Sequence, residues 1–229
     1  MPSASYFSEG LFTFLRDLEA NNDRDWFKAN KARYEELLRA PALELIEQFG
    51  PHLQKLSPHF VADPRPVGGS LFRIHRDTRF AKDKRPYKTS VGIHFRHEVA
   101  KDAHAPGYYI HISPEQSFVA LGLWMPETAV ARKIREAIVD DPSGYRKAIT
   151  NKRFTETLAL GGDKLKRPPR GVDADHPLVE ELKRKSFMAS TYITRKTVKS
   201  PDFVRTVTGA FRAGTPLMKF LCKAVDVPF

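Results

Sequence analysis

Apolar residues near the start of the chain recur with the period of an α-helix. The positions that fit the i, i+3, i+4, i+7 spacing are Leu11, Phe14, Leu15 and Leu18. Ser8 suits the N-cap of this helix, and Asp23 suits the N-cap of the next. Pro41 suits the first turn of a third helix, where the backbone N–H has no helical partner. The pattern therefore predicts helices over residues 8–56.

Between residues 71 and 125 apolar and polar residues alternate with period two, the period of a β-strand. The alternating segments are 71–76, 89–96, 107–113 and 117–125. Their connections are too short for the helical crossovers that parallel strands need, so we predict an antiparallel meander. In its last hairpin we expect Ile110 opposite Val119 and Ile112 opposite Ser117. This register places the small residues Ala120 and Gly122 on the same face of the sheet as the larger Tyr109 and His111.

Helical periodicity returns after the meander and predicts a helical region over residues 127–225. A basic, proline-rich stretch at 164–176 interrupts it and predicts a surface loop. A short extended piece at 187–193 and a last helix over 201–224 follow. The predicted fold class is α+β, with an antiparallel meander of four to five strands flanked by N-terminal and C-terminal helices in one domain, 1–229.

The composition fits a globular domain, since 41% of the 229 residues are hydrophobic and 28% are charged. Residues 1–10 lack the basic start and apolar stretch of a secretory signal, and the single Cys222 has no disulfide partner in the chain. The longest apolar run, 119–125, is too short to cross a bilayer. We therefore expect a cytoplasmic protein with no membrane association, in which Cys222 is a buried structural thiol.

The segment from Phe72 to Lys88 reads FRIHRDTRFAKDKRPYK. It resembles the signature of a widespread bacterial and fungal family catalogued as a domain of unknown function. Further stretches that resemble this family are 22–27, 107–112, 122–124 and 165–177, so that the resemblance covers roughly residues 6–225. The resemblance implies a single compact unit. It implies no catalytic residue, cofactor or substrate.

The segment 73–88 holds seven Arg or Lys residues and only two carboxylates, Asp77 and Asp83. The net charge of +11 favours an anionic partner, either a small molecule or a nucleic acid, although a generally basic surface would also keep the protein soluble. Arginine forks and lysines bind phosphate, and Phe80 and Tyr87 could stack on bases. The expected ligand contacts are Arg73, Arg76, Arg79, Lys82, Lys84 and Lys88, with Tyr109. The alternative is a structural clasp in which the two aspartates pair with neighbouring cations.

Histidines form the second candidate site. If Phe72 and Ile74 and their counterparts on the next two strands face the core, alternation sends Arg73, His75, His94, Arg96, Tyr109 and His111 to the opposite face. His75, His94 or His111 could then act as a general base or metal ligand, with Asp77 as an orienting carboxylate. No short-range ligand spacing supports a metal, so we expect neither a metal nor a cofactor. We place Trp26 and Trp124 in the core.

Three functions remain open from the sequence. The first is binding, or also processing, of a phosphate-bearing or other anionic ligand through segment 73–88. The second is an enzyme that uses the histidines, and the third is a protein-interaction module without a small-molecule site. A flat, featureless sheet face would favour the third. The sequence leaves the oligomeric state open.

Overall fold

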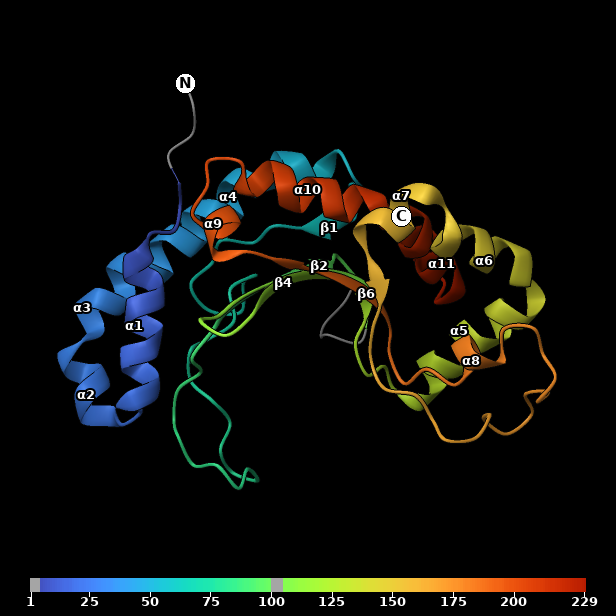
Figure 1. Cartoon of the computed structure of the whole chain (residues 1–229), viewed down its shortest axis with the longest axis horizontal. Coiled ribbons are helices and arrows are strands. Elements are labelled where there is room, and N and C mark those ends of the chain that lie inside the picture. The colour runs from blue at the N-terminus through green and yellow to red at the C-terminus, as the bar shows by residue number, and fades with distance from the viewer. Residues whose placement is uncertain (1–4, 100–104) are drawn as a thin grey trace.

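One antiparallel sheet organises the chain, and the computed structural model describes residues 5–99 and 105–229 of it (Figure 1). The predicted domain 1–229 also includes residues 1–4 and 100–104, which lie outside the described residues. The strands are β1 (Phe60–Val61), β2 (Val91–His97), β3 (Gly107–Ile112), β4 (Ser117–Leu123), β5 (Ala159–Leu160) and β6 (Phe187–Ile193). The helices are α1 (Glu9–Ala20), α2 (Arg24–Ala29), α3 (Lys31–Tyr34), the π-helical η1 (Glu35–Arg39), α4 (Ala40–Gln54), α5 (Thr128–Asp140), α6 (Pro142–Thr150), α7 (Lys152–Thr157), α8 (Val179–Leu182), α9 (Arg195–Val198), α10 (Phe203–Ala213) and α11 (Thr215–Ala224).

The N-terminal helices begin where their capping residues predict. The Ser8 hydroxyl accepts a hydrogen bond from the backbone N–H of Gly10, and the Asp23 carboxylate accepts from two N–H groups in the first turn of α2. Pro41 lies in the first turn of α4. The prediction of helices over 8–56 is confirmed, with a π-helical turn at η1 that the periodicity did not indicate.

The sheet has six antiparallel strands in the order β1-β2-β3-β4-β6-β5. The predicted hairpin register is confirmed, because Ile110 pairs with Val119. The predicted α+β class, an antiparallel sheet flanked by N-terminal and C-terminal helices, is confirmed, but the sheet has six strands rather than four or five and extends beyond 71–125. β1 precedes that range, and β6, predicted only as an extended piece, pairs with β4 along its whole length. Strands β5 and β6 also interrupt the predicted helical region 127–225.

The segment 71–76, predicted as a strand, forms only isolated bridges, from Leu71 to Ile93 and from His75 to Tyr87. Its start follows β2, since Phe72 N–H donates to the Gly92 carbonyl. The segment then leaves the sheet, because Tyr87, with which His75 pairs, is attached to helix α2. The Tyr87 ring stacks on Phe27 of α2 with centroids 4.1 Å apart. Tertiary contacts therefore override the alternating pattern here.

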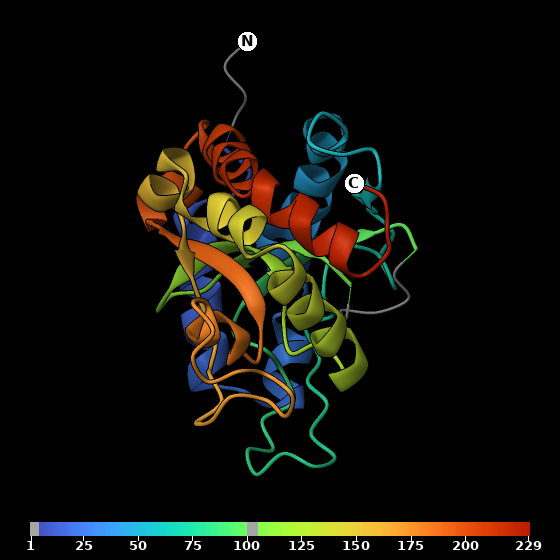
Figure 2. The same ribbon diagram turned by 90° about the vertical axis from the view of Figure 1, so that its right-hand side faces the viewer.

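Helices α4, α10 and α11 cover one face of the sheet (Figures 1 and 2). The strand residues predicted to face this core are buried, namely Val91, Ile93, Phe95, Tyr108, Ile110 and Ile112. Phe95 stacks on Phe49 of α4 with ring centroids 4.8 Å apart. The helix predicted over 201–224 is two helices that meet at Gly214, where a Cβ would lie 2.1 Å from a Leu121 methyl carbon. Cys222 is buried in α11, as predicted, and burial raises the pKa of its thiol to about 12.

Two lobes extend beyond the ends of the sheet on its other side, so the molecule has the outline of an arch (Figure 1). One lobe holds α1, α2, α3 and the segment 73–88, and the other holds α5, α8 and the loop 164–176. None of the helices in the described part of the chain has the length and apolar character that a membrane crossing requires.

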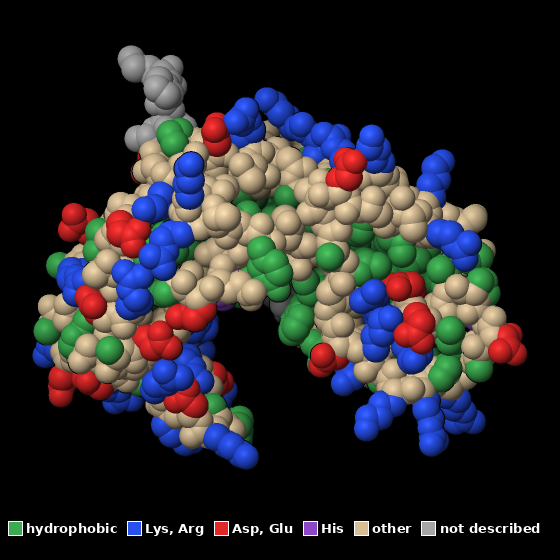
Figure 3. Space-filling view, in the orientation of Figure 1, with side chains coloured by type: hydrophobic (Ala, Val, Ile, Leu, Met, Phe, Trp, Pro, Cys, Tyr) green, Lys and Arg blue, Asp and Glu red, His purple; other side chains and the backbone are tan. Residues whose placement is uncertain are grey.

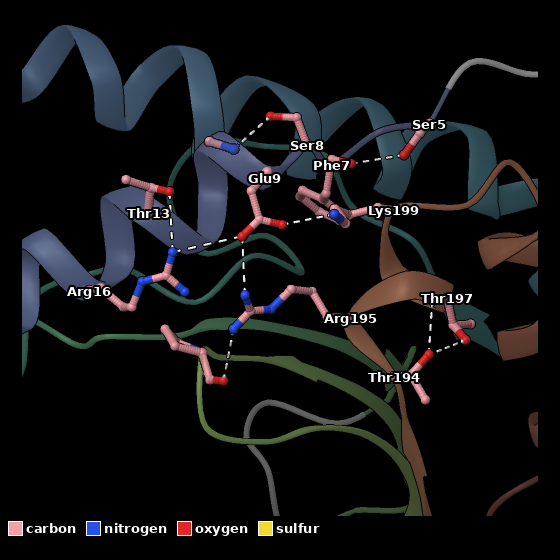
Figure 4. A network of polar contacts seen from close by, with 12 residues as sticks. Ser5, Phe7, Ser8, Glu9, Thr13, Arg16, Thr194, Arg195, Thr197 and Lys199 are labelled. Carbon is pink, nitrogen blue, oxygen red and sulfur yellow. Dashed lines mark hydrogen bonds and ion pairs between the residues drawn. The ribbon is translucent and has the colours of Figure 1, made fainter.

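An ion-pair network attaches the first lobe to the C-terminal half (Figure 4). The Glu9 carboxylate accepts hydrogen bonds from Lys199 Nζ at 2.8 Å and from Arg195 Nη1 at 3.1 Å. Arg195 also reaches the Pro114 carbonyl in the β3–β4 turn. These contacts lower the pKa of Glu9, mainly through the hydrogen bond from Lys199. The network fixes α1 beside one end of the sheet.

Candidate functional site

The face of the sheet that the helices leave uncovered, here called the open face, carries a hollow of about 570 Å³. It lies between the two lobes, and Figure 3 shows the molecule hollowed on this side, with lysines and arginines at the ends of both lobes. The residues that line it are Phe72, His94, Gly107, Tyr109, Gln116, Phe118, Ala120, Leu121, Gly122, Trp124, Gly161, Gly162, Met188, Ser190 and Tyr192. We call this hollow the aromatic groove.

The groove exists because small residues cross its floor. Two rows of paired positions run over the strands, Gly107, Gly122 and Met188 in one and Tyr109, Ala120 and Ser190 in the other. Gly107 has no room for a side chain, because a Cβ there would lie 2.2 Å from His94 Nε2. Gly122 adopts φ +119°, which favours glycine, and a Cβ there would meet the Phe187 carbonyl oxygen at 2.2 Å. The predicted placement of Ala120 and Gly122 on the face of Tyr109 is confirmed.

Aromatic rings surround this floor. Phe72 contacts both His94 and Tyr109, with ring centroids 5.9 Å and 5.8 Å apart. The side chains of Trp124 and Tyr192 stand out into solvent, at 61% and 70% exposure. Exposed rings beside a hollow are surfaces on which a planar ligand could stack.

Two predictions about these rings are wrong. Trp124 lies in the groove rather than in the core, because Gly122 and Met125, with positive φ at both, turn the chain outward at the end of β4. Phe72 faces the groove rather than the core, since it follows β2 on the side of His94. Trp26 is partly buried against the core, where it stacks on Phe14.

Two of the three candidate histidines meet on the open face. The Tyr109 hydroxyl lies 3.1 Å from His111 Nδ1, and the Tyr109 and His94 rings are in edge contact. Burial lowers the pKa of His94 to about 4, with a further contribution from the Arg96 charge, and burial also lowers the pKa of His111. Burial raises the pKa of Tyr109 to about 12. All three side chains are therefore neutral near pH 7.

His75 does not join them, contrary to the predicted arrangement. Its ring contacts Phe27 and Tyr87, because the segment leaves the sheet at this point. The Asp77 carboxylate pairs with Arg79 and has no contact with any histidine of the described chain. These two candidates therefore lie apart from the groove. No group of three or more His, Cys, Asp or Glu side chains in residues 5–99 and 105–229 could hold a metal ion.

Most cations of segment 73–88 already have partners within it. Asp83 accepts hydrogen bonds from Arg76 Nη1 at 2.7 Å and from Arg85 Nε at 3.0 Å, and these contacts hold its pKa far below the usual range. Arg79 Nη2 lies 2.7 Å from Asp77 Oδ2. Lys84 donates to the Thr78 carbonyl. The clasp that the sequence left as an alternative is present, and ligand binding by Arg76, Arg79 and Lys84 stays a prediction.

Arg73, Lys82 and Lys88 are cations of the segment that take no part in its ion pairs. Lys88 Nζ donates to the Arg73 carbonyl at 2.8 Å and lies 5.5 Å from the centroid of the Phe72 ring, at the edge of the groove. Burial lowers the pKa of Lys88, and the nearby Arg73 charge lowers it further. Neither residue has a carboxylate partner among the described residues, and Lys82 has none either.

Three of the stretches on which the family resemblance rests contribute residues to the groove. Phe72 comes from the long signature, Gly107 and Tyr109 from the second element, and Gly122 and Trp124 from the third. In the first element, the Asn22 side chain exchanges two hydrogen bonds of 3.0 Å with the Tyr87 backbone. Sequence reasoning missed the contributions of β6, namely Met188, Ser190 and Tyr192. Their alternation within 187–193 was the only available signal.

The fold and this face define a basic α+β protein with an open-faced antiparallel sheet that carries an aromatic groove. The chain belongs to a family of conserved hypothetical proteins, DUF2461, whose family model matches residues 10–220. Searches of curated proteins and of solved structures gave no match to the chain.

Proposed function

We propose that the aromatic groove binds a phosphate-bearing ligand that also has a planar aromatic group, the chemistry of a nucleotide. The hollow of about 570 Å³ with its rim of aromatic rings is the observation that carries the proposal. Ligand sites are concave, mostly apolar and equipped with a few polar groups, and this groove offers His94, Gln116 and Ser190 among its rings. Bases stack on exposed aromatic side chains whatever their sequence.

The charges around the groove favour an anion. Lys88 stands at its edge, near enough to the Arg73 charge for its pKa, already lowered by burial, to be lowered further by it, and a phosphate there would relieve that repulsion. Lys166, Arg167 and Arg170 have no ion-pair partner in the described residues. They belong to the loop 164–176, which lies at the end of the other lobe (Figure 1). The proposed ligand therefore enters an arch that is cationic on both sides.

A second candidate function is proton transfer on that ligand. The Tyr109 hydroxyl in hydrogen-bonding distance of His111, together with neutral His94, is the observation that favours it. Neutral imidazoles can accept a proton near pH 7. In this reading His94 or His111 is the general base. The interaction module receives less support, because the open face is hollowed rather than flat.

The proposal requires no cofactor, and it places the protein in the cytoplasm, where nucleotides and nucleic acids are available. The free buried thiol of Cys222 suits a reducing compartment.

Calorimetric titration of the protein with a nucleoside monophosphate, with the neutral nucleoside and with a short single-stranded oligonucleotide tests this proposal. Trp124→Ala should weaken binding of all three about 10- to 100-fold, since stacking on one aromatic ring contributes about 1–3 kcal/mol. Phe80→Ala is the matched control, because Phe80 is 94% exposed but lies on segment 73–88 outside the groove.

A nucleic-acid ligand would show itself by binding that strengthens with oligonucleotide length and falls steeply with salt. If the ligand is a mononucleotide, binding does not strengthen with oligonucleotide length, and its salt dependence is that of a single phosphate. The proposal fails if none of the three ligands binds the wild type, or if Phe80→Ala weakens binding and Trp124→Ala does not.

A further inference from the structure

A second, smaller hollow lies where β1 pairs with β2 at the edge of the sheet. Its volume is about 170 Å³, and His94 lines both this hollow and the aromatic groove. Arg96 lies on the open face two positions after His94, opposite Gly107 of β3. The loop 63–70, which follows β1, forms the other side. We call this smaller space the Arg96 hollow.

The carboxylates at the Arg96 hollow are already occupied. Asp63 Oδ2 accepts a hydrogen bond from Arg65 Nε at 2.8 Å. Glu98 Oε1 lies 2.6 Å from His59 Nδ1. Neither acid is hydrogen-bonded to Arg96, although the Arg96 charge helps to lower the pKa of Asp63 after the larger effect of the Arg65 hydrogen bond.

Two nitrogen atoms at the same hollow have no partner. Arg96 Nε and His94 Nδ1 are both buried, and neither forms a hydrogen bond with any residue of 5–99 or 105–229. His94 as a whole is only 8% exposed. A buried polar atom without a partner costs about 1–3 kcal/mol, and more when the group is charged. Both atoms belong to residues that line one cavity, and a ligand with acceptor oxygens bound there would give them partners.

Hydrogen bonds within the loop 63–70 hold it in place as one wall of the Arg96 hollow. Ser70 N–H donates to the Asp63 carbonyl at 2.8 Å, and the Ser70 hydroxyl accepts from Asp63 N–H at 3.0 Å. Gly69 is needed for this closure, because a Cβ there would lie 2.4 Å from the Arg65 carbonyl oxygen. The stretch Gly68-Gly69-Ser70 lacks the lysine that follows the glycines of a nucleotide-binding P-loop. Here it borders a hollow whose cation comes from the neighbouring strand.

We propose that the Arg96 hollow is a subsite for a tetrahedral oxyanion, a phosphate group in particular, bound by the Arg96 guanidinium and by the Nδ1–H of neutral His94. A guanidinium offers several N–H donors in a fixed plane, which matches the several acceptor oxygens of a phosphate. A metal ion is unsuited to this place because the cation is already present and both carboxylates are taken.

The subsite also suggests how the ligand lies, a step that rests on the proposed function of the groove. His94 borders both spaces, so one molecule can place its phosphate in the Arg96 hollow and its planar group over Tyr109 and Trp124. Lys88 then lies at the groove's edge as a second cationic contact.

Binding of inorganic phosphate tests the subsite without any aromatic ligand. We would measure the rise in melting temperature with phosphate at constant ionic strength, with chloride as the reference anion, together with the change in the His94 imidazole ¹⁵N signals. Arg96→Gln should weaken phosphate binding about 10-fold or more, because charge-assisted hydrogen bonds contribute about 1.5–3 kcal/mol each. Arg96→Lys keeps the positive charge but lacks the planar set of N–H donors, so it should bind phosphate more tightly than Arg96→Gln and more weakly than the wild type.

Arg205→Gln is the matched control, since it removes the same charge from an exposed Arg–Asp pair on α10, outside both hollows. It should leave phosphate binding unchanged. Circular dichroism of each variant establishes that it is folded. If Arg96→Gln does not fold, Arg96→Lys and the His94 signals of the wild type decide the question, and absence of a phosphate effect on those signals overturns the subsite.

The outcomes separate the two proposals. If phosphate does not stabilise the wild type, or if Arg96→Gln binds it as well as the wild type, the subsite is wrong, and binding of the neutral nucleoside still supports the groove. If phosphate binds through Arg96 and the nucleoside does not bind at all, the groove proposal is wrong and the subsite stands. An equal loss of phosphate binding in Arg205→Gln would also overturn the subsite, because the loss would then depend on net charge rather than on the hollow.

Discussion

Segment 73–88 and the open face of the sheet both combine cations with aromatic rings, and they differ in how their polar groups are satisfied. In the segment, Asp83 binds two arginines and Asp77 binds a third. On the open face, Arg96 Nε and His94 Nδ1 are buried without a described partner. Three of the segment's seven cations are therefore held by its two carboxylates, whereas Arg96 forms no ion pair within the described residues. Unpaired groups at a cavity, rather than the number of charges, mark the better candidate site.

Segment 73–88 also has a structural role. Its last residues join the first lobe to the sheet, through the Asn22 amide on the Tyr87 backbone and the Phe27 ring on the Tyr87 ring. Phe72, directly before the segment, lines the groove, and Lys88 Nζ lies 5.5 Å from the centroid of the Phe72 ring. The segment thereby holds one wall of the arch in place beside the groove.

The largest expected effect comes from breaking that join. Tyr87 is 6% exposed and packs face to face on Phe27, so Tyr87→Ala should lower the free energy of unfolding by about 3–5 kcal/mol, as for other buried aromatic side chains. Denaturant unfolding measures the loss. Phe80→Ala, which removes an aromatic side chain exposed to solvent on the same segment, should change it little. Equal losses in the two variants would contradict the structural role of Tyr87.

A smaller effect should appear as a pH dependence centred on the open face. The folded-state pKa of His94 is lowered to about 4, below its ordinary value near 6.5, so the unfolded chain binds a proton between these values and the folded chain does not. Its contribution is therefore complete above pH 6.5 and is lost as the pH falls towards 4. The shift corresponds to about 3 kcal/mol.

His94→Gln isolates this contribution from those of the carboxylates. Chemical unfolding of the wild type and the variant is measured at several pH values between 7 and 4. The free energy of unfolding of the wild type should fall by about 3 kcal/mol more than that of the variant as the pH falls, because only the wild type carries the His94 imidazole. If the free energies of unfolding of the two proteins fall in parallel, His94 titrates normally, and the open face is more hydrated than its buried nitrogen indicates.

The parts of the fold that the sequence predicted are those set by local pattern. Residues 11–18 repeat with helical period, and the register of Ile110 with Val119 follows from alternation and a short turn. The strand predicted at 71–76 failed because the stacking of Tyr87 on Phe27 draws the segment away from the sheet, a contact between residues far apart in the chain. The π-helical turn and the division at Gly214 depend on packing in the same way.

The candidate site was predicted only in part, for a related reason. Alternation placed His94, Tyr109 and His111 on one face correctly, since these positions lie on adjacent strands. It could not reveal that β6, more than sixty residues further along, would pair with β4 and add Ser190 and Tyr192 to the groove. It also could not distinguish Arg79, which pairs with Asp77, from Arg96, whose Nε has no hydrogen-bond partner among the described residues, because pairing depends on where side chains end in space.

The smallest expected effect concerns the cations on which the sequence placed most weight. Arg79 and Asp77 are both exposed, at 77% and 45% of their side chains, and water and salt screen such a pair. Arg76 is less exposed, but Asp83 keeps Arg85 when Arg76 is removed. The double variant Arg76→Gln with Arg79→Gln should therefore lower stability only slightly, and by less at high salt than at low salt. It should bind phosphate as well as the wild type. Unfolding at two salt concentrations, together with the phosphate titration, measures both quantities. A strong loss of phosphate binding with unchanged stability would reverse the comparison, because it would make the clasp the anion site and leave the unpaired nitrogens of the open face without a ligand.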